Sequence, residues 1–417
     1  MHVLASHIFW IWIISLASIL CMLLRPRGIR EAAWIGTGAV FLVALQLIPL
    51  RSALQAVGKG TDVYFFLAGM MLLAELARHE GVFDWIADIA VRHAHRSASR
   101  LFLLIYITGT VVTALLSNDA TAVVLTPAIL AAVRRARVNP KPYLLACALI
   151  ANAASFLLPV SNPANLVVYG HRLPPLGSWL KIFLLPSVAS VVVTFFCLRY
   201  LCRKPLASSI QSHEDSVSLD PAGRLALSGL IFASVVLLTA SALGIGLGIP
   251  TCAAAVASLM LVSVKDHGIF KRAALDIAWS ILPLVAGLFV LVEALNSAGL
   301  LQLIQEAFKW AARQPKLVGY LATAGGAGIL SNVMNNLPVG LAAGAALPVA
   351  PQLSHAALIG VNLGPNLSVT GSLATILWLI ALRREEVEIT PWQFLKTGLI
   401  VMPAALFLSV LALRIAA

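Results

Sequence analysis

The stretch "TALLSNDATAVVLTPAIL" (Thr113 to Leu130) places a carboxylate, Asp119, inside a run that is otherwise apolar enough to lie in lipid. An acid at the centre of a membrane span costs at least about 2.5–3.5 kcal/mol on insertion scales, so such residues usually serve ions or protons. No Lys or Arg lies in this run. We therefore expect Asp119 to be readily protonated and to carry a proton. The alternative is that it only caps the helix that follows.

The composition is that of a polytopic membrane protein. Hydrophobic residues make up 60% and charged residues 11% of the 417 residues, whereas soluble domains have about 45–50% and about 25%. Apolar runs long enough to cross a bilayer recur from end to end. The net charge of +12 comes from short basic blocks between these runs, such as "RPRGIR" and "RRARVNPK". Such blocks indicate orientation in the membrane and not nucleic-acid binding.

The two halves of the chain resemble each other. A polar segment, 203–224, separates residues 1–202 from residues 225–417 and is expected to be a cytoplasmic linker. An Ala-Gly pair, a Glu, a Gly and a Ser-Asn pair recur in the same order in both halves. They lie at Ala68-Gly69, Glu75, Gly81 and Ser117-Asn118, and at Ala286-Gly287, Glu293, Gly299 and Ser331-Asn332. This order indicates an internal repeat.

Each half is expected to be all-α, with five membrane spans, one of them broken, an amphipathic stretch and a re-entrant hairpin. The amphipathic stretches, hairpins and broken spans are predicted at 82–91, 101–133 and 143–169, and at 300–313, 317–350 and 354–381. Basic residues flank both ends of the first hairpin, so its polar tip should lie inside the membrane. Prolines, which lack an amide hydrogen, interrupt the broken spans. Five crossings is an odd number, so the halves would be inverted relative to each other, with both chain ends outside.

Polar residues gather at these four interruptions. Unwound backbone at membrane depth is tolerated only where protein buries it or where it lines a cavity. Ser, Asn and Thr form hydrogen bonds there without carrying charge. Two tips and two breaks in symmetric pairs are typical of the midplane site of a secondary transporter, although helix contacts and caps also use these residues. The candidate substrate-binding residues are Ser117, Asn118, Asn152, Asn162, Asn165, Ser331, Asn332, Asn335, Asn336, Asn366 and Thr370.

Two glutamates at matching places are weaker candidates. Glu75 and Glu293 lie near the ends of the third spans and are either structural anchors of the repeat or, with Asp119, proton-coupling sites. Arg78 lies three residues after Glu75, a spacing that suits an ion pair on a helix surface. No nucleotide-binding loop, zinc-protease motif or Ser/His/Asp set is recognisable, so we expect no enzyme, cofactor or metal site. Energy must then come from an ion gradient or a partner subunit.

The motifs "LLSNDATAVVLTPAI", "SNPANL" and "SNVMNNLPVGL" resemble those of the ArsB-type arsenite efflux permeases of the ion transporter superfamily. The resemblance implies export of arsenite and antimonite from the bacterial cytoplasm in exchange for protons, sometimes with a cytoplasmic ATPase subunit. It implies a protein of the bacterial inner membrane. It also implies a scaffold domain, which could form a homodimer, and a transport domain that holds both hairpins and moves as an elevator.

The chemistry of this substrate suits the residues. Arsenite at neutral pH is mainly the uncharged trihydroxide, which neutral Asn, Ser and Thr groups can bind and which gives Arg no charge to pair with. As(III) also prefers thiolate ligands, and Cys147 lies five residues before Asn152, but a sulfur trap would slow release. The alternatives are a sodium-coupled carboxylate carrier, from whose paired Ser-Asn-Thr tips this chain departs, a sodium/proton antiporter and a passive channel.

Overall fold

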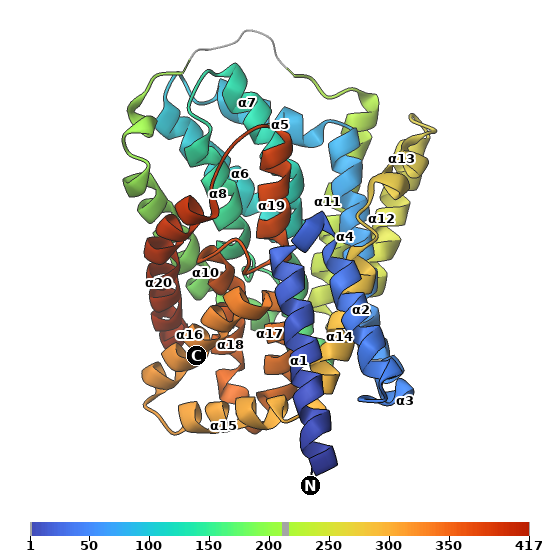
Figure 1. The fold of residues 1–417 in the computed structure, drawn as a ribbon. Helices are drawn as coiled ribbons and strands as arrows, with labels where there is room; N and C mark the ends of the chain where they lie inside the picture. The colour runs from blue at the N-terminus through green and yellow to red at the C-terminus, as the bar shows by residue number, and fades with distance from the viewer. Residues whose placement is uncertain (1, 211–216, 417) are drawn as a thin grey trace.

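The computed structural model describes residues 2–210 and 217–416, so residues 211–216 of the predicted linker lie outside the described residues. Within these ranges the chain is largely helical (Figure 1). Seven of the described helices are long and apolar enough to cross a membrane, or eight if the bent pair formed by residues 50–59 and 61–79 is one span. The expected all-α, multi-pass membrane fold is confirmed.

The two halves have the same order of helices. The first half contains α1 (His2–Leu24), α2 (Glu31–Ala44), α3 (Leu50–Lys59), α4 (Thr61–His79), α5 (Val82–Arg92), α6 (Ala98–Leu115), α7 (Thr126–Arg135), α8 (Lys141–Ala153), α9 (Pro163–Tyr169) and α10 (Leu176–Leu201). The second half contains α11 (Pro221–Ala242), α12 (Gly248–Ser263), α13 (Ile269–Asp276), α14 (Ile281–Ser297), α15 (Leu300–Ala312), α16 (Lys316–Met334), α17 (Asn336–Ala346), α18 (Ser354–Leu363), α19 (Leu373–Arg384) and α20 (Pro391–Ala416). A π-helical turn, Ala120–Leu125, leads into α7.

Local sequence explains where these helices begin. Pro163 starts α9, where its missing amide hydrogen costs no intrahelical bond, and the side chain of Asn162 caps this helix by accepting a bond from the Ala164 amide. Gly81 and Gly299 precede the amphipathic helices α5 and α15 and have φ angles of 66° and 103°. Only glycine adopts such angles without steric cost, so the matched glycines set the same turn in both halves.

Matching helices also make matching contacts. Helix α4 packs against α12, as α14 packs against α2, and α10 packs along α20. A Cβ added at Gly69 would lie 2.7 Å from the backbone of Thr251, and one added at Gly287 would lie 2.7 Å from the side chain of Ile35. The two matched glycines therefore allow the close crossings of α4 with α12 and of α14 with α2.

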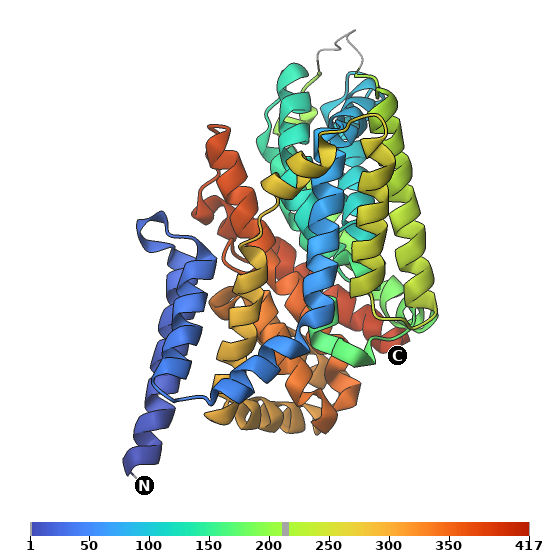
Figure 2. The ribbon, with the colours of Figure 1, turned by 90° about the vertical axis from the view of Figure 1, so that its right-hand side faces the viewer.

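The matching surface helices lie at opposite ends of the molecule. In Figure 1, α3 and α15 lie at the lower end, whereas α13 and α5 lie near the upper end. Helices α3 and α13, which the sequence did not predict, each lead into the long helix that follows. Figure 2 shows α1 and α2, in dark blue, at one side of the molecule, where both contact α14.

Candidate functional site

Four irregular segments interrupt the helices of the bundle. The first tip, residues 116–119, turns the chain between α6 and the π-helical turn. The second tip, residues 331–336, consists of the end of α16, the single non-helical residue Asn335 and the start of α17. The first break, residues 154–162, separates α8 from α9, and the second break, residues 364–372, separates α18 from α19. The polar residues of the sequence analysis lie at or beside these segments.

Asparagines from opposite halves join the two breaks. Nδ2 of Asn162 donates to Oδ1 of Asn362 over 2.7 Å, and Nδ2 of Asn362 donates to Oδ1 of Asn165 over 3.0 Å. Nδ2 of Asn152 donates to Oδ1 of Asn366, also over 3.0 Å. All five side chains are at most 2% exposed. The structure thus brings these predicted residues together as a closed network, with most of their hydrogen-bonding groups occupied, and adds Asn362 to them.

Asn332 connects the second tip to the second break. Its Oδ1 accepts from the backbone amide of Ser368 over 3.0 Å and from the Ser368 hydroxyl over 2.7 Å. Its Nδ2 donates to the carbonyl of Gly364 over 2.8 Å, and its own carbonyl accepts from the hydroxyl of Thr370 over 2.9 Å. Asn332 and Thr370 therefore hold the second tip against the second break.

The other residues of the second tip support the turn itself. Asn335 has a φ of 74°, and its side chain caps α17 by accepting from the Leu337 amide over 3.3 Å. The amide of Asn336 donates to the carbonyl of Gly371 over 2.9 Å. Ser331 is fully buried, and its hydroxyl donates to a carbonyl of its own helix. These polar groups of Ser331, Asn335 and Asn336 are therefore occupied by contacts within the protein.

In the first tip, the side chain of Asp119 does not take part in the hydrogen bonds that hold the turn. Oγ of Ser117 accepts from the amide of Ala120 over 3.1 Å and so caps the second arm of the hairpin. The carboxylate of Asp119 makes no hydrogen bond or ion pair with the described part of the chain. Oγ of Ser161, in the first break, donates to the carbonyl of Ala114 over 3.0 Å. Hydrogen bonds thus connect, in order, the end of α6 beside the first tip, the first break, the second break and the second tip.

Asp119 borders a small cavity of about 70 Å³, which we call the upper cavity. Helix α4, the first tip, the start of α9, the segment before α14 and helix α19 contribute to it. Its lining is largely apolar and includes Met70, Met71, Glu75, Ser117, Asp119, Pro163, Ile277, Ala278 and Leu377. Among the described lining residues there is no Lys or Arg. The space admits water-sized molecules beside an acid that lacks a cationic partner.

A cluster of charged groups borders the upper cavity at the ends of α4 and α13. Arg78 contacts Glu75 over 2.6 Å and Asp276 over 2.8 Å, and Nε2 of His79 lies 3.0 Å from the Asp276 carboxylate. Glu75, His79 and Asp276 each offer one ligand atom within 4.8 Å of the others. The Arg78 guanidinium already lies between the two carboxylates, so its charge opposes a metal cation there.

Glu293, the counterpart of Glu75, pairs with a basic residue of another helix. Its carboxylate lies 2.9 Å from Nζ of Lys59, which ends α3. Arg78, held by Glu75, therefore joins α4 to α13 through Asp276, whereas Glu293 joins α14 to α3 directly. Cys147 is buried in α8 and lines neither the upper cavity nor the larger one described next.

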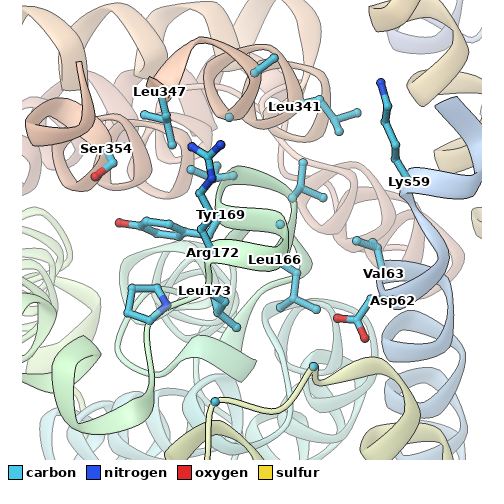
Figure 3. A pocket seen from close by; sticks show the side chains of 18 of the residues that line it. Lys59, Asp62, Val63, Leu166, Tyr169, Arg172, Leu173, Leu341, Leu347 and Ser354 are labelled. Atoms are coloured by element: carbon cyan, nitrogen blue, oxygen red, sulfur yellow. The ribbon is translucent and has the colours of Figure 1, made fainter. Parts of the chain in front are cut away.

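A larger cavity of about 830 Å³, which we call the lower cavity, lies between α4, α9, α14 and α17 (Figure 3). The side chains of Arg172, Tyr169 and Leu347 lie along one wall, with Lys59 and Asp62 across from them. Oδ1 of Asp62 accepts from the amide of Gly248 over 2.8 Å and so fixes the start of α12. The cavity extends toward the end of the molecule that carries α3.

A polytopic helical bundle with interrupted helices, linked hairpin tips and a cavity toward each end belongs to the class of membrane transporters. The chain is a member of the CitMHS family, described as citrate transporters, which it matches over residues 8–367. Family membership confirms the expectation of a transporter and not an enzyme.

Individual relatives agree with this class. An arsenical pump membrane protein of Escherichia coli is 26% identical over 96% of this chain and 97% of its own, and one of Yersinia enterocolitica is 28% identical over 94% and 95%. The resemblance noted in the sequence is thus confirmed, as is the location in the bacterial inner membrane. The crystal structure of the YdaH transporter of Alcanivorax borkumensis shares the fold, with a TM-score of 0.58 over 87% of each chain at 15% identity.

Sequence reasoning missed several residues around the site. Asn362 lies inside the predicted broken span 354–381 but was not predicted as a site residue, although its place matches that of Asn152 in the other half. Leu377 and Ile277 line the upper cavity from the second half. Apolar residues in apolar helices give no sequence signal of this kind, because nothing distinguishes them from core residues.

Proposed function

We propose that the chain is a secondary active transporter that exports arsenite and antimonite as neutral trihydroxides in exchange for protons. The names of its relatives support the substrates. The observation that carries the mechanism is the position of Asp119, which borders the upper cavity without a hydrogen-bond or ion-pair partner in the described part of the chain. An unpaired acid in apolar surroundings favours its neutral form and can exchange a proton when water reaches it.

An uncharged substrate suits the polar groups that remain free. Oδ1 of Asn118 and Oδ1 of Asn152 are buried without a hydrogen-bond partner among the described residues. Such acceptors gain from a ligand that donates hydroxyl hydrogens, and arsenous acid carries three. We assign substrate contact to Ser117, Asn118 and Asn152. The remaining predicted asparagines would hold the breaks and tips in place.

The arrangement of helices supports alternating access by two inverted repeats, residues 1–202 and 225–417. The surface helices of one half lie at the opposite end from their counterparts, as inversion requires (Figure 1). We propose that α6–α10 and α16–α20 form the transport domain, which moves as an elevator against a scaffold of α1–α4 and α11–α14. Within this scaffold Glu75, through Arg78, would hold α13 to α4, and Glu293 would hold α3 to α14.

The two cavities then define the state of the transporter. The basic ends of α5 and α7 lie near the upper end in Figure 1, which we assign to the cytoplasm. The lower cavity is larger than the upper one and lies toward the opposite end. We therefore assign the structure to an outward-facing state, in which a substrate would leave and a proton would enter.

Uptake of arsenite into inverted vesicles tests this proposal. A pH gradient with the vesicle interior acidic should drive arsenite uptake by the wild type. Asp119→Asn should lose the part of the uptake that depends on this gradient. Glu388→Gln, which changes an exposed acid in the loop before α20, is the matched control and should transport as the wild type does. Full gradient-driven uptake by Asp119→Asn would refute proton coupling at this residue.

A sodium- or proton-coupled carboxylate carrier is the second candidate. The family description and the guanidinium of Arg172 in the lower cavity favour it, because Arg binds carboxylates with two parallel hydrogen bonds. Saturable citrate uptake that Arg172→Gln abolishes, together with no arsenite uptake by the wild type, would establish this candidate and exclude the first.

A further inference from the structure

Helix α15 lies across the lower end of the second hairpin. It is amphipathic, as the sequence predicted, and contacts both arms of that hairpin, α16 and α17. Leu300 and Phe308 are buried against the hairpin, whereas Leu303 is 64% and Trp310 55% exposed. A helix with this pattern at a membrane surface places its apolar face at the depth of the headgroups and upper acyl chains.

An apolar groove of about 350 Å³ runs between α15 and the hairpin. On α16 it is lined from Ala322 to Met334, a rise of about 18 Å, and so reaches the second tip. The one hydroxyl group in its described lining, that of Thr323, already donates to the carbonyl of Gly319 over 2.8 Å. Apart from the indole N–H of Trp310 at its rim, the lining offers no free polar side chain to an ionic or hydroxylated solute, so the groove suits a hydrocarbon chain.

Basic side chains gather where α15 meets α16. Lys309, Arg313 and Lys316 lie there with one acid, Glu306, whose carboxylate pairs with Lys309 over 2.7 Å. Arg313 has no ion-pair partner among the described residues, and Lys316 lies over the ring of Tyr320. This corner thus keeps two positive charges in excess, next to an apolar groove. Arg and Lys at such a surface attract anionic lipid headgroups.

We propose that the groove binds one acyl chain of an anionic phospholipid, whose phosphate lies against Arg313 and Lys316. Charge complementarity at the mouth and the nearly all-apolar lining identify this occupant. The bound chain fills the space between α15 and α16 as far as Met334. The lipid thereby links the membrane-surface helix to the second tip, and its binding does not depend on which solute is transported.

A pair of adjacent glycines allows a matched test. A Cβ added at Gly326 or at Gly325 meets no atom within 4 Å, so both helix positions have space for a side chain. Gly326 lines the groove and Gly325 does not. Gly326→Leu therefore fills the groove, while Gly325→Leu adds the same side chain outside it. An unchanged melting temperature for both variants shows that each is folded.

The binding experiment uses the full-length protein in phosphatidylcholine vesicles. Brominated phosphatidylglycerol is added as a minor component, and brominated phosphatidylcholine serves as the neutral comparison. The signal is the quenching of Trp310 fluorescence, obtained as the difference between each protein and its Trp310→Phe variant. We expect stronger quenching by the anionic lipid in the wild type and in Gly325→Leu, and loss of this preference in Gly326→Leu. Arg313→Gln and Lys316→Gln should each weaken the binding roughly fivefold.

Other outcomes overturn the proposal. Equal quenching by the two brominated lipids would mean that Trp310 meets only the surrounding bilayer. An anionic preference that Gly326→Leu retains would place the headgroup contact outside the groove. A dimer in lipid nanodiscs that Gly326→Leu separates would identify a second copy of the chain as the occupant.

Discussion

The side-chain amide of Asn162 donates a 2.7 Å hydrogen bond to Oδ1 of Asn362, and so joins the first break to the helix before the second break. The same oxygen accepts a hydrogen bond from the hydroxyl of Ser155. These residues lie 200 and 207 positions from Asn362 in the chain, and all three are buried. Because the tips are hydrogen-bonded to the breaks, this contact fixes the position of one hairpin relative to the other.

Replacement of Asn362 should therefore destabilise the protein strongly. Asn362→Leu removes the acceptor of Asn162 Nδ2 and the donor to Asn165 Oδ1, and each buried group left unpaired costs about 1–3 kcal/mol. Ser155→Ala removes a single hydroxyl and should cost about 1 kcal/mol. Thermal unfolding of the purified protein in detergent measures both effects. A melting temperature of Asn362→Leu equal to that of Ser155→Ala would show that the bonds of Asn362 to Asn162 and Asn165 add little to stability.

The crossing of α4 and α12 should be sensitive to a single methyl group. At Gly69 an added Cβ would lie 2.7 Å from the backbone of Thr251, so Gly69→Ala must push the helices apart. Overpacking of this kind costs about 1–3 kcal/mol. Gly36→Ala, on α2, adds the same methyl group where no atom lies within 4 Å, and should be neutral or slightly stabilising. Equal melting temperatures for the two variants would show that the crossing tolerates the added atom.

Much of the architecture is predictable because lipid imposes strict rules on sequence. Polar residues such as Ser117 and prolines such as Pro163 are conspicuous in apolar runs. They mark unwound backbone, which is tolerated at membrane depth only where protein buries it or where it lines a cavity. Gly81 and Gly299 recur because both take left-handed φ angles. The membrane class and the transporter class are thereby predicted from composition and motifs alone, and the comparisons confirm them.

The partners of the polar residues could not be predicted in this way. Nothing in the sequence shows that Asn162 meets Asn362, because the contact depends on how the two halves pack. From the sequence, all the candidate asparagines were predicted to bind substrate. In the structure, most of their polar groups form hydrogen bonds that hold the breaks and tips together. The short helices α3 and α13 were missed because their polar residues read as loops between spans.

Glu80 should give the protein a pH-dependent stability. It follows α4 at the upper end, its side chain is only 5% exposed, and burial raises its pKa, with Asp220 adding to this and Arg272 opposing it. A carboxyl whose pKa is higher in the folded than in the unfolded state stabilises the fold in acid, and this contribution is lost as the pH rises through the folded value. Glu80→Gln should thus melt at a higher temperature than the wild type at neutral pH.

The difference in melting temperature between Glu80→Gln and the wild type should shrink as the pH falls below the range in which Glu80 titrates. Melting curves of both proteins across an acid-to-neutral pH series measure it. Glu388→Gln, an exposed carboxyl in a loop, should give no such trend. A constant difference at every pH would assign the effect of Glu80→Gln to packing and not to titration.

The charged cluster at the ends of α4 and α13 should control access to the upper cavity. Arg78 contacts Glu75 and Asp276, and Asp276 immediately precedes Ile277 and Ala278, which line the cavity. Arg78→Gln breaks both contacts. Because an exposed ion pair contributes at most about 1 kcal/mol to stability, the fold should persist. The end of α13 should then open more often and admit water to the cavity.

The rate at which a membrane-impermeant maleimide labels a cysteine introduced by Ala278→Cys measures this opening, after subtraction of labelling in the parent chain. Arg78→Gln should speed labelling roughly fivefold, which is the ratio that about 1 kcal/mol corresponds to. Arg134→Gln breaks an ion pair with Glu385 that borders neither cavity, and should leave the rate unchanged. If Arg78→Gln and Arg134→Gln label at the same rate, helix packing and not the charged cluster keeps the upper cavity closed.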